Sequence, residues 1–352
     1  MKMHIALSLA LAALVATAPA GARTVYRCVR KTDGQPVIIK VPTKAYPSLA
    51  EITKLKQEYE VATTLDMPGV VSCIALEKHE NALALITKDS GCTSLDLLAG
   101  RAPVDMEFFL AITLRLADTL ARVHEKGIIH KDIKSSNIVA TRDGSIVEII
   151  DFGSASLLST ELQREPAASK FIEGTLTHIS PEQTGRINRN LDHRSDLYSL
   201  GVTLYELLTG QLPFQSDDPL EMVHCHLART PRSPHQLNRS IPETISAIIM
   251  KLLAKTPEER YRTATGLGAD LERYRDAVAQ GKTMNPTDIG RFDRKGVFQI
   301  PQKLVGRAAE VSTLLEAFDR VCAGPPEMLL VSGYSGIGKS SLVHEVHKPI
   351  VA

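Results

Sequence analysis

Four polar residues near the middle of the chain could carry out chemistry together. Residues 130–137 read HKDIKSSN and residues 151–153 read DFG. Asp132 could accept or orient the proton of a substrate hydroxyl, and Lys134 could stabilise the charge of a phosphoryl group during transfer. Asn137 and Asp151 offer oxygen ligands of the kind that Mg²⁺ prefers. The set predicts phosphoryl transfer, in which phosphates are held, neutralised and aimed at a hydroxyl.

A lysine and a glutamate nearer the N-terminus extend this set. Lys40 lies in the apolar segment VIIKV (residues 37–41), where a buried cation is costly without a partner. Glu58 follows on a predicted helix and could form the ion pair that fixes Lys40 against the α- and β-phosphates of a nucleotide. Taken alone, Lys40 could equally be a solvated strand residue. Together with residues 130–153 it is predicted to bind nucleotide.

A second nucleotide motif lies near the C-terminus, where residues 333–340 read GYSGIGKS. Its glycines, Gly333 and Gly338, predict a phosphate-binding loop, in which Lys339 would reach the β- and γ-phosphate oxygens and Ser340 would bind Mg²⁺. A strand at 327–332 and a helix at 340–347 are predicted on either side. Only about 50 residues of such a module are present, too few for its sheet. We therefore expect a remnant of a longer protein rather than a working ATPase.

The elements that must position these residues change in kind along the chain. Strand-like segments are predicted at 24–29, 37–41, 70–76 and 82–87, with a hairpin turn at 32–35 and one helix at 48–65. From residue 95 onward helices dominate, and they are predicted at 106–126, 196–209, 241–253, 264–280 and 308–321. Gly, Pro, Asn and mixed charge in residues 281–302 predict a linker.

With these motifs in view, residues 23–279 resemble the protein kinase superfamily, and a lysine two residues after the catalytic aspartate resembles its Ser/Thr branch. The resemblance implies an α+β, bilobal fold with a small β-rich N-lobe carrying one helix (23–88) and a larger helical C-lobe (89–280). A linker (281–302) and the truncated start of a P-loop NTPase α/β module (303–352) would follow. It also implies ATP and Mg²⁺ as cofactors and a protein Ser or Thr hydroxyl as acceptor.

Further motifs narrow the resemblance. Residues 180–182, SPE, look like the end of an activation segment, which implies that Glu182 pairs with Arg260. Residues 304–307 (LVGR) resemble the entry to AAA-type ATPase modules. Residues 177–186 (THISPEQTGR) and 298–301 (FQIP) resemble large bacterial signalling proteins. In those proteins a Ser/Thr kinase domain precedes an AAA-type ATPase module and a sensor histidine kinase. Histidine-kinase or response-regulator components are therefore expected as downstream partners.

Two departures from the family pattern leave alternatives open. A Gly-rich loop over the phosphates is missing, because residues 20–26 read AGARTVY. Lys131 stands where arginine is common, and it lacks the fork that pairs with an activation-loop phosphate at sites such as Ser169, Thr175 or Thr177. The open alternatives to an active kinase are a regulatory ATP-binding pseudokinase and a fragment of an ATPase regulator centred on Lys339.

The N-terminus points to a different compartment from the rest of the chain. Residues 1–22 have a basic start, a short apolar run and a small-x-small site, as secretory signals do. An exported kinase would lack ATP, so we expect a cytoplasmic protein, with membrane association or export as the alternative.

Net charge of +1 gives no electrostatic reason to expect nucleic acid. The five scattered cysteines and residues 224–226, HCH, have neither disulfide nor metal-site spacing.

Overall fold

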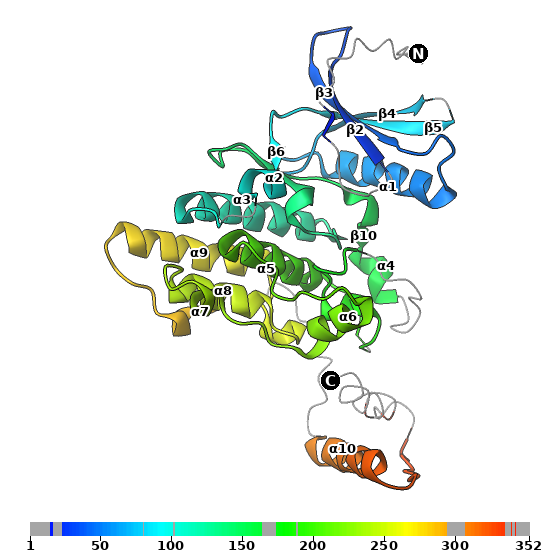
Figure 1. Ribbon diagram of the computed structural model, residues 1–352, viewed down its shortest axis with the longest axis vertical. Coiled ribbons are helices and arrows are strands. Elements are labelled where there is room, and N and C mark those ends of the chain that lie inside the picture. Colours follow the sequence, from blue (N-terminus) through cyan, green and yellow to red (C-terminus); the bar gives the residue numbers. More distant parts are fainter. Residues whose placement is uncertain are drawn as a thin grey trace. The chain divides into compact units, whose positions relative to one another are not determined.

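A computed structural model describes most of the chain, namely residues 15–16, 23–79, 81–100, 103–163, 174–187, 189–293, 307–334, 339 and 342. Figure 1 labels most of its helices and strands. The chain divides into two compact units, a first unit of residues 1–156 and a second unit of residues 157–352. The lobe boundary expected at residues 88/89 stays a prediction. Mixed α+β structure is confirmed, with strands concentrated in the first unit and helices in the second.

A five-stranded antiparallel sheet forms the β-rich part of the first unit. Its strands, in spatial order, are β1 (Val15–Ala16), β2 (Arg23–Val29), β3 (Pro36–Pro42), β5 (Ala82–Lys88) and β4 (Cys73–His79). β2 and β3 form the expected hairpin, with Gly34 at a φ of 70° in the turn. The buried face of the sheet is made by Cys28, Val37, Ile39, Ala84 and Ile86.

One predicted strand, at 70–76, begins later than expected, at Cys73. The backbone of residues 69–71 is bonded elsewhere: Val71 N donates to Ile149 O at 3.1 Å, and Ile149 N donates to Gly69 O at 2.8 Å. These hydrogen bonds join the segment to another strand of the first unit. The apolar pattern of residues 70–76 does not show whether a residue pairs with β5 or with Ile149 of β9 (Val147–Ile149).

Helix α1 (Leu49–Leu65) covers the sheet and begins where the sequence predicts. Ser48 caps it, and Ser48 and Glu51 form a reciprocal capping box. Its buried residues are Leu55, Glu58, Ala62 and Leu65, spaced three or four apart along one face. Glu58 therefore points inward because it lies on the apolar stripe of the helix.

The remaining elements of the first unit surround the HKDIKSSN loop. They are β6 (Thr93–Ser94), α2 (Leu95–Ala99), α3 (Met106–Glu125), β7 (Ile128–Ile129), β8 (Ile138–Ala140), β9 (Val147–Ile149) and β10 (Ser156–Leu157), of which β10 ends in the second unit. Antiparallel pairing of Ile138 with Ile149 brings the start of β8 beside the end of β9. Asn137 and Asp151, which flank these strands, are thereby held at the same end of the hairpin.

The second unit is mainly helical. Its helices are α4 (Leu158–Gln163), α5 (Arg194–Thr209), α6 (Pro219–Ala228), α7 (Pro234–Leu237), α8 (Glu243–Leu252), α9 (Ala264–Ala279) and α10 (Ala308–Ala323). α5 is buried along nearly its whole length and ends at Gly210, whose φ is 72°. Among the described residues, no helix combines the length and the apolar content that crossing a bilayer requires.

Residues 281–293 differ from the linker that their composition predicts. Asp293 accepts hydrogen bonds from Arg262 N and from Thr263, the N-cap of α9. Gly290 N donates to Asp270, and Thr244 in α8 donates to Met284 O. These bonds fasten the segment to α8 and α9. Residues 294–302, the rest of the predicted linker, lie outside the described residues.

The C-terminal part of the second unit agrees only partly with its prediction. Helix α10 forms where expected, but residues 327–332 form no strand, and Met328 and Leu330 are almost fully exposed. A parallel strand needs a neighbour to satisfy its backbone, and the described part of residues 307–342 contains none. The predicted strand is therefore wrong for this structure. Most of the helix predicted at 340–347 lies outside the described residues.

Candidate active site

The predicted ion pair between β3 and α1 is present in the first unit. Lys40 Nζ lies 2.6 Å from Glu58 Oε1, and both side chains are buried. Burial alone would lower the pKa of the Lys40 ammonium, but Glu58 and Asp151 outweigh burial and raise it. Lys40 therefore stays charged at neutral pH. Helix α1 is further fastened by Gln57 Nε2, which donates to Ala155 O just beyond the DFG segment.

The HKDIKSSN loop (residues 130–137) is organised around one carboxylate. Lys134 Nζ donates to Asp132 Oδ2 at 2.9 Å, and Asn137 Nδ2 donates to the same oxygen at 3.0 Å and to Asp132 O at 2.9 Å. His130 Nε2 lies 3.0 Å from Ile150 O, which ties the start of the loop to the end of β9. The three residues expected to aim the acceptor hydroxyl and neutralise charge are thus in direct contact.

Asp151 occupies a strained backbone position. Its φ is 63°, in the left-handed region that non-glycine residues rarely adopt. Phe152, the next residue, is fully buried, and its ring packs edge-on against His130 at a centroid distance of 4.7 Å. Burial alone would raise the pKa of the Asp151 carboxyl, but Lys40 and Arg23 outweigh it and hold the pKa well below its usual value. Asp151 is therefore an ionised carboxylate.

Two of these residues suit a magnesium ion. Asp151 supplies carboxylate oxygens, and Asn137 uses its amide nitrogen on Asp132, which leaves its amide oxygen as the ligand atom. Magnesium in phosphoryl-transfer sites is bound by one or two such protein oxygens together with substrate phosphates. The donor set fits that requirement, and β8 and β9 bring the two residues to one end of their hairpin.

Arg23 is a site residue that the sequence did not identify. Its Nη1 lies 2.8 Å from Glu58 Oε2 and 3.0 Å from Asp151 Oδ1, so it joins two of the predicted residues. One signal could have found it. In the kinase pattern G-x-G-x-x-G-x-V, a glycine stands two residues before the valine, and Arg23 stands two residues before Val25.

A second ion pair implied by the resemblance forms in the second unit. Arg260 Nη1 and Nη2 donate to the two carboxylate oxygens of Glu182 at 2.6 and 2.8 Å. Ser195 Oγ donates to Glu182 Oε1 at 2.7 Å. All three residues are buried, so this pair holds the end of the activation segment to α5 and to the loop before α9.

The phosphate-binding loop is described only in part. Lys339 Nζ donates to Gly333 O and Tyr334 O, each at 2.8 Å. Gly338 and Ser340 lie outside the described residues, as do Ser169, residues 298–301 and most of residues 1–22. Nucleotide binding by this loop therefore stays a prediction.

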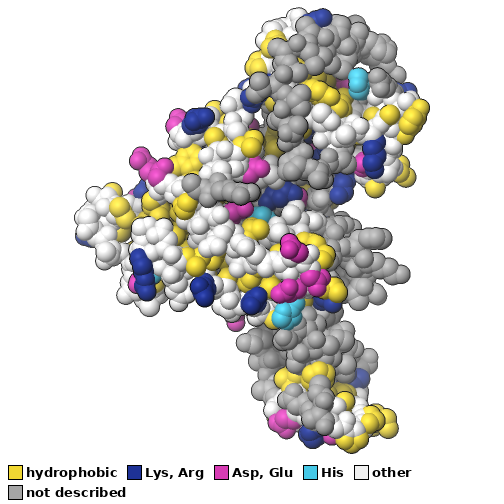
Figure 2. Space-filling view, in the orientation of Figure 1, with side chains coloured by type: hydrophobic (Ala, Val, Ile, Leu, Met, Phe, Trp, Pro, Cys, Tyr) yellow, Lys and Arg dark blue, Asp and Glu magenta, His cyan; other side chains and the backbone are white. Residues whose placement is uncertain are grey.

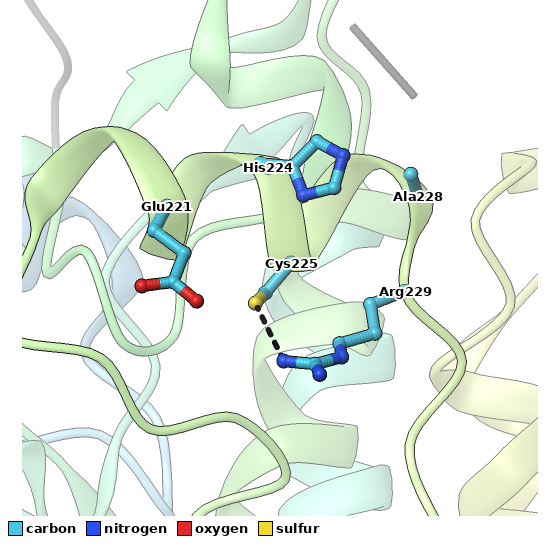
Figure 3. Close-up of a pocket in the computed structure, with 5 residues that line it drawn as sticks. All are labelled: Glu221, His224, Cys225, Ala228 and Arg229. Atoms are coloured by element: carbon cyan, nitrogen blue, oxygen red, sulfur yellow. Dashed lines mark hydrogen bonds between the residues drawn. The ribbon is translucent and has the colours of Figure 1, made fainter.

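One cavity of the second unit contains none of the predicted site residues. It measures about 410 Å³ and is lined by Glu221, His224, Cys225, Ala228 and Arg229, on and just after α6 (Figure 3). Cys225 Sγ accepts a hydrogen bond from Arg229, and His226 Nδ1 lies 2.9 Å from Tyr198 Oη. Cys225 and His226 therefore have separate partners, and the described residues contain no cluster of three or more metal-ligating side chains.

Charge is distributed without large single-sign areas on the face that Figure 2 shows. Basic and acidic side chains are interspersed there, in keeping with the net charge of +1. The concentration of charge that matters for chemistry is internal, in the cluster of Arg23, Lys40, Glu58 and Asp151.

Two parts of the chain match the models of two different protein families. The model of the protein kinase domain matches residues 21–269, and the model of the AAA ATPase domain matches residues 303–352. The first match begins just before β2 and includes every residue of the charged cluster and of the HKDIKSSN loop. The second contains the GYSGIGKS motif.

Individual relatives are named as kinases. A hybrid signal transduction histidine kinase G of Dictyostelium discoideum is 29% identical over 70% of this chain and 10% of its own length. A probable serine/threonine-protein kinase of Clostridium perfringens is 30% identical over 72% of this chain and 37% of its own. The serine/threonine-protein kinase PknB of Mycobacterium leprae is 32% identical over 62% of this chain and 35% of its own. The chain thus spans well under half the length of these relatives.

Proposed function

The chain belongs to the protein kinase domain family, and we propose that it is an ATP-dependent serine/threonine protein kinase. The observation that carries the proposal is the assembled cluster of the first unit. Lys40 is paired with Glu58, and Asp151 lies in the same charged group. Kinases need both the lysine–glutamate pair and the DFG aspartate in place before transfer can occur.

In this proposal each residue has one task. Lys40 holds the α- and β-phosphates of ATP, and Glu58 fixes Lys40. Asp132 orients the acceptor Ser or Thr hydroxyl and takes its proton, while Lys134 stabilises the charge on the transferred phosphoryl group. Asn137 and Asp151 would hold Mg²⁺, which supplies charge neutralisation at the phosphates when bound.

The partners of the proposed reaction are ATP and a protein with an accessible Ser or Thr hydroxyl. Because ATP is an intracellular metabolite, we propose a cytoplasmic location. One relative is a hybrid signal transduction histidine kinase. On that basis, histidine-kinase or response-regulator components are the downstream partners that we propose.

The proposal is tested by replacing Asp132 with alanine. Transfer of the γ-phosphate of magnesium–ATP to a protein substrate should fall on the order of 10²- to 10⁴-fold, because the hydroxyl loses its base. The matched control is Asp143→Ala, which removes an exposed aspartate whose partners among the described residues are Thr141 and Ser145 in the β8–β9 turn. Its transfer rate should be unchanged.

Two outcomes would contradict the proposal. Equal transfer by the wild-type and Asp132→Ala chains would place the activity elsewhere. A wild-type chain that binds magnesium–ATP but transfers nothing would instead support a regulatory nucleotide-binding module.

A further inference from the structure

Arg23 has hydrogen-bonding capacity that its ion pairs do not use. An arginine offers five N–H donors in a planar fork. Both ion pairs of Arg23 use Nη1, and neither Nη2 nor Nε has a hydrogen-bond partner among the described residues. The side chain is 20% exposed, so part of the guanidinium faces solvent. A purely structural arginine would be expected to use more of its donors.

The position of Arg23 places these donors beside the predicted nucleotide phosphates. Its Nη1 shares the carboxylate of Glu58 with Lys40, the residue proposed to hold the α- and β-phosphates. Its Nη2 lies 3.2 Å from the point that a Cβ on Gly153 would occupy, so the guanidinium also lies against the DFG segment. The open donors are thus within the charged cluster rather than at its periphery.

Formal charge gives a second reason to assign Arg23 a ligand. The site holds three cations (Arg23, Lys40 and Lys134) and three carboxylates (Glu58, Asp132 and Asp151). Without Arg23, two cations would face three carboxylates, so the guanidinium adds positive charge where an anionic nucleotide would bind. The sequence also lacks the Gly-rich loop whose backbone N–H groups cover the phosphates in related proteins.

We propose that Arg23 binds the phosphate groups of the nucleotide through Nη2 and Nε, and so replaces donors that a Gly-rich loop would supply. The inference rests on the proposed function, because it takes the Lys40 cluster to be the nucleotide site. Guanidinium and phosphate match in geometry and charge, and such pairs form parallel charge-assisted hydrogen bonds. Nη1 keeps Glu58 and Asp151 in position while the other nitrogens bind the ligand.

The test compares the binding of three ligands, magnesium–ATP, magnesium–ADP and adenosine, by isothermal titration calorimetry on the full chain. Arg23→Gln should weaken magnesium–ATP on the order of 10- to 100-fold, the effect of losing charged hydrogen bonds. The affinity for magnesium–ADP should fall less, and the affinity for adenosine, which has no phosphate, should stay that of the wild type. Arg23→Lys keeps the positive charge but lacks the planar pair of N–H donors. Its affinity for magnesium–ATP should therefore lie between those of the wild type and Arg23→Gln.

The matched control is Arg27→Gln. Arg27 is on the same strand, four residues further on, and pairs with Asp89 at 2.7 Å rather than with any site residue. Its affinity for all three ligands should be that of the wild type. Thermal unfolding of each variant verifies that the chain is folded, and Arg23→Lys carries the test if Arg23→Gln does not fold.

Each other result has a definite meaning. If Arg23→Gln binds magnesium–ATP as tightly as wild type, or more tightly, Arg23 is not a phosphate ligand. If Arg23→Gln lowers the affinity for adenosine as much as that for magnesium–ATP, Arg23 only maintains the fold, and the inference is again wrong. If the folded wild-type chain binds no magnesium–ATP, the proposed function and this inference fail together.

Discussion

Two arginines of this protein bind carboxylates in different ways, and the difference separates a structural ion pair from a functional one. Arg260 in the second unit is fully buried and directs all three of its nitrogens to protein acceptors. These are Glu182, Ala254 O, Arg194 O and Lys255 O. Arg23 in the first unit is partly exposed, and its hydrogen bonds to described residues all come from Nη1.

The comparison teaches that the number of arginine N–H donors with a protein acceptor says more about the role of an arginine than the presence of an ion pair does. A guanidinium with every N–H satisfied has nothing left for a ligand, and its removal exposes buried acceptors. A guanidinium with open donors, such as that of Arg23 beside Asp151, can bind a ligand without breaking its existing contacts. The predictions below test whether this distinction holds.

The largest effect on stability is expected from Arg260→Gln. It leaves Glu182 buried without its charged partner, and losing one member of a buried pair costs about 3–5 kcal/mol. Urea denaturation monitored by circular dichroism would measure the change in the free energy of unfolding. A loss below about 1 kcal/mol would show that the pair is dispensable and would remove the contrast with Arg23.

Lys40→Met should separate function from stability. Phosphate transfer should fall on the order of 100-fold or more, because a cation at the phosphates is lost. The cost in stability should be smaller than that of Arg260→Gln, since Glu58 keeps its contact with Arg23.

A double-mutant cycle measures how far Arg23 compensates for Lys40. The double variant Arg23→Gln/Lys40→Met leaves Glu58 buried and unpaired, so it should lose more unfolding free energy than the two single variants added together. Simple additivity would mean that the two cations do not share Glu58 in solution.

The smallest effect is expected at the other nucleotide motif. Lys339→Ala removes hydrogen bonds to Gly333 O and Tyr334 O only, among the described residues. Phosphate transfer by the chain should therefore be unchanged within experimental error. A large loss in a transfer assay would instead favour the reading in which the chain is part of an ATPase regulator.

How far the sequence predicts the structure depends on how local each signal is. The ion pair of Lys40 and Glu58 could be predicted because a strand pattern and a capped amphipathic helix fix both residues. Asn137 and Asp151 could be predicted as magnesium ligands from their residue types and motifs, whereas the pairing of β8 with β9, which brings them to one end of a hairpin, was not predicted. These signals lie within a few residues of the site.

The parts that could not be predicted depend on contacts between distant segments. Arg23 follows Ala and Gly at the start of a strand, and nothing nearby in the sequence indicates Asp151 as its partner. Residues 284–293 have the composition of a linker, yet Asp293 bonds the first turn of α9. The strand predicted at 327–332 failed for the same reason, since a strand depends on a neighbour elsewhere in the chain.

Phosphoamino-acid analysis of a protein substrate after incubation with magnesium and γ-labelled ATP tests the central claim most directly. We predict label on phosphoserine or phosphothreonine with the wild-type and Asp143→Ala chains, and none above background with Asp132→Ala. Absence of label with a folded wild-type chain that binds magnesium–ATP, or equal labelling by Asp132→Ala, would contradict the assignment of this site as a serine/threonine kinase centre.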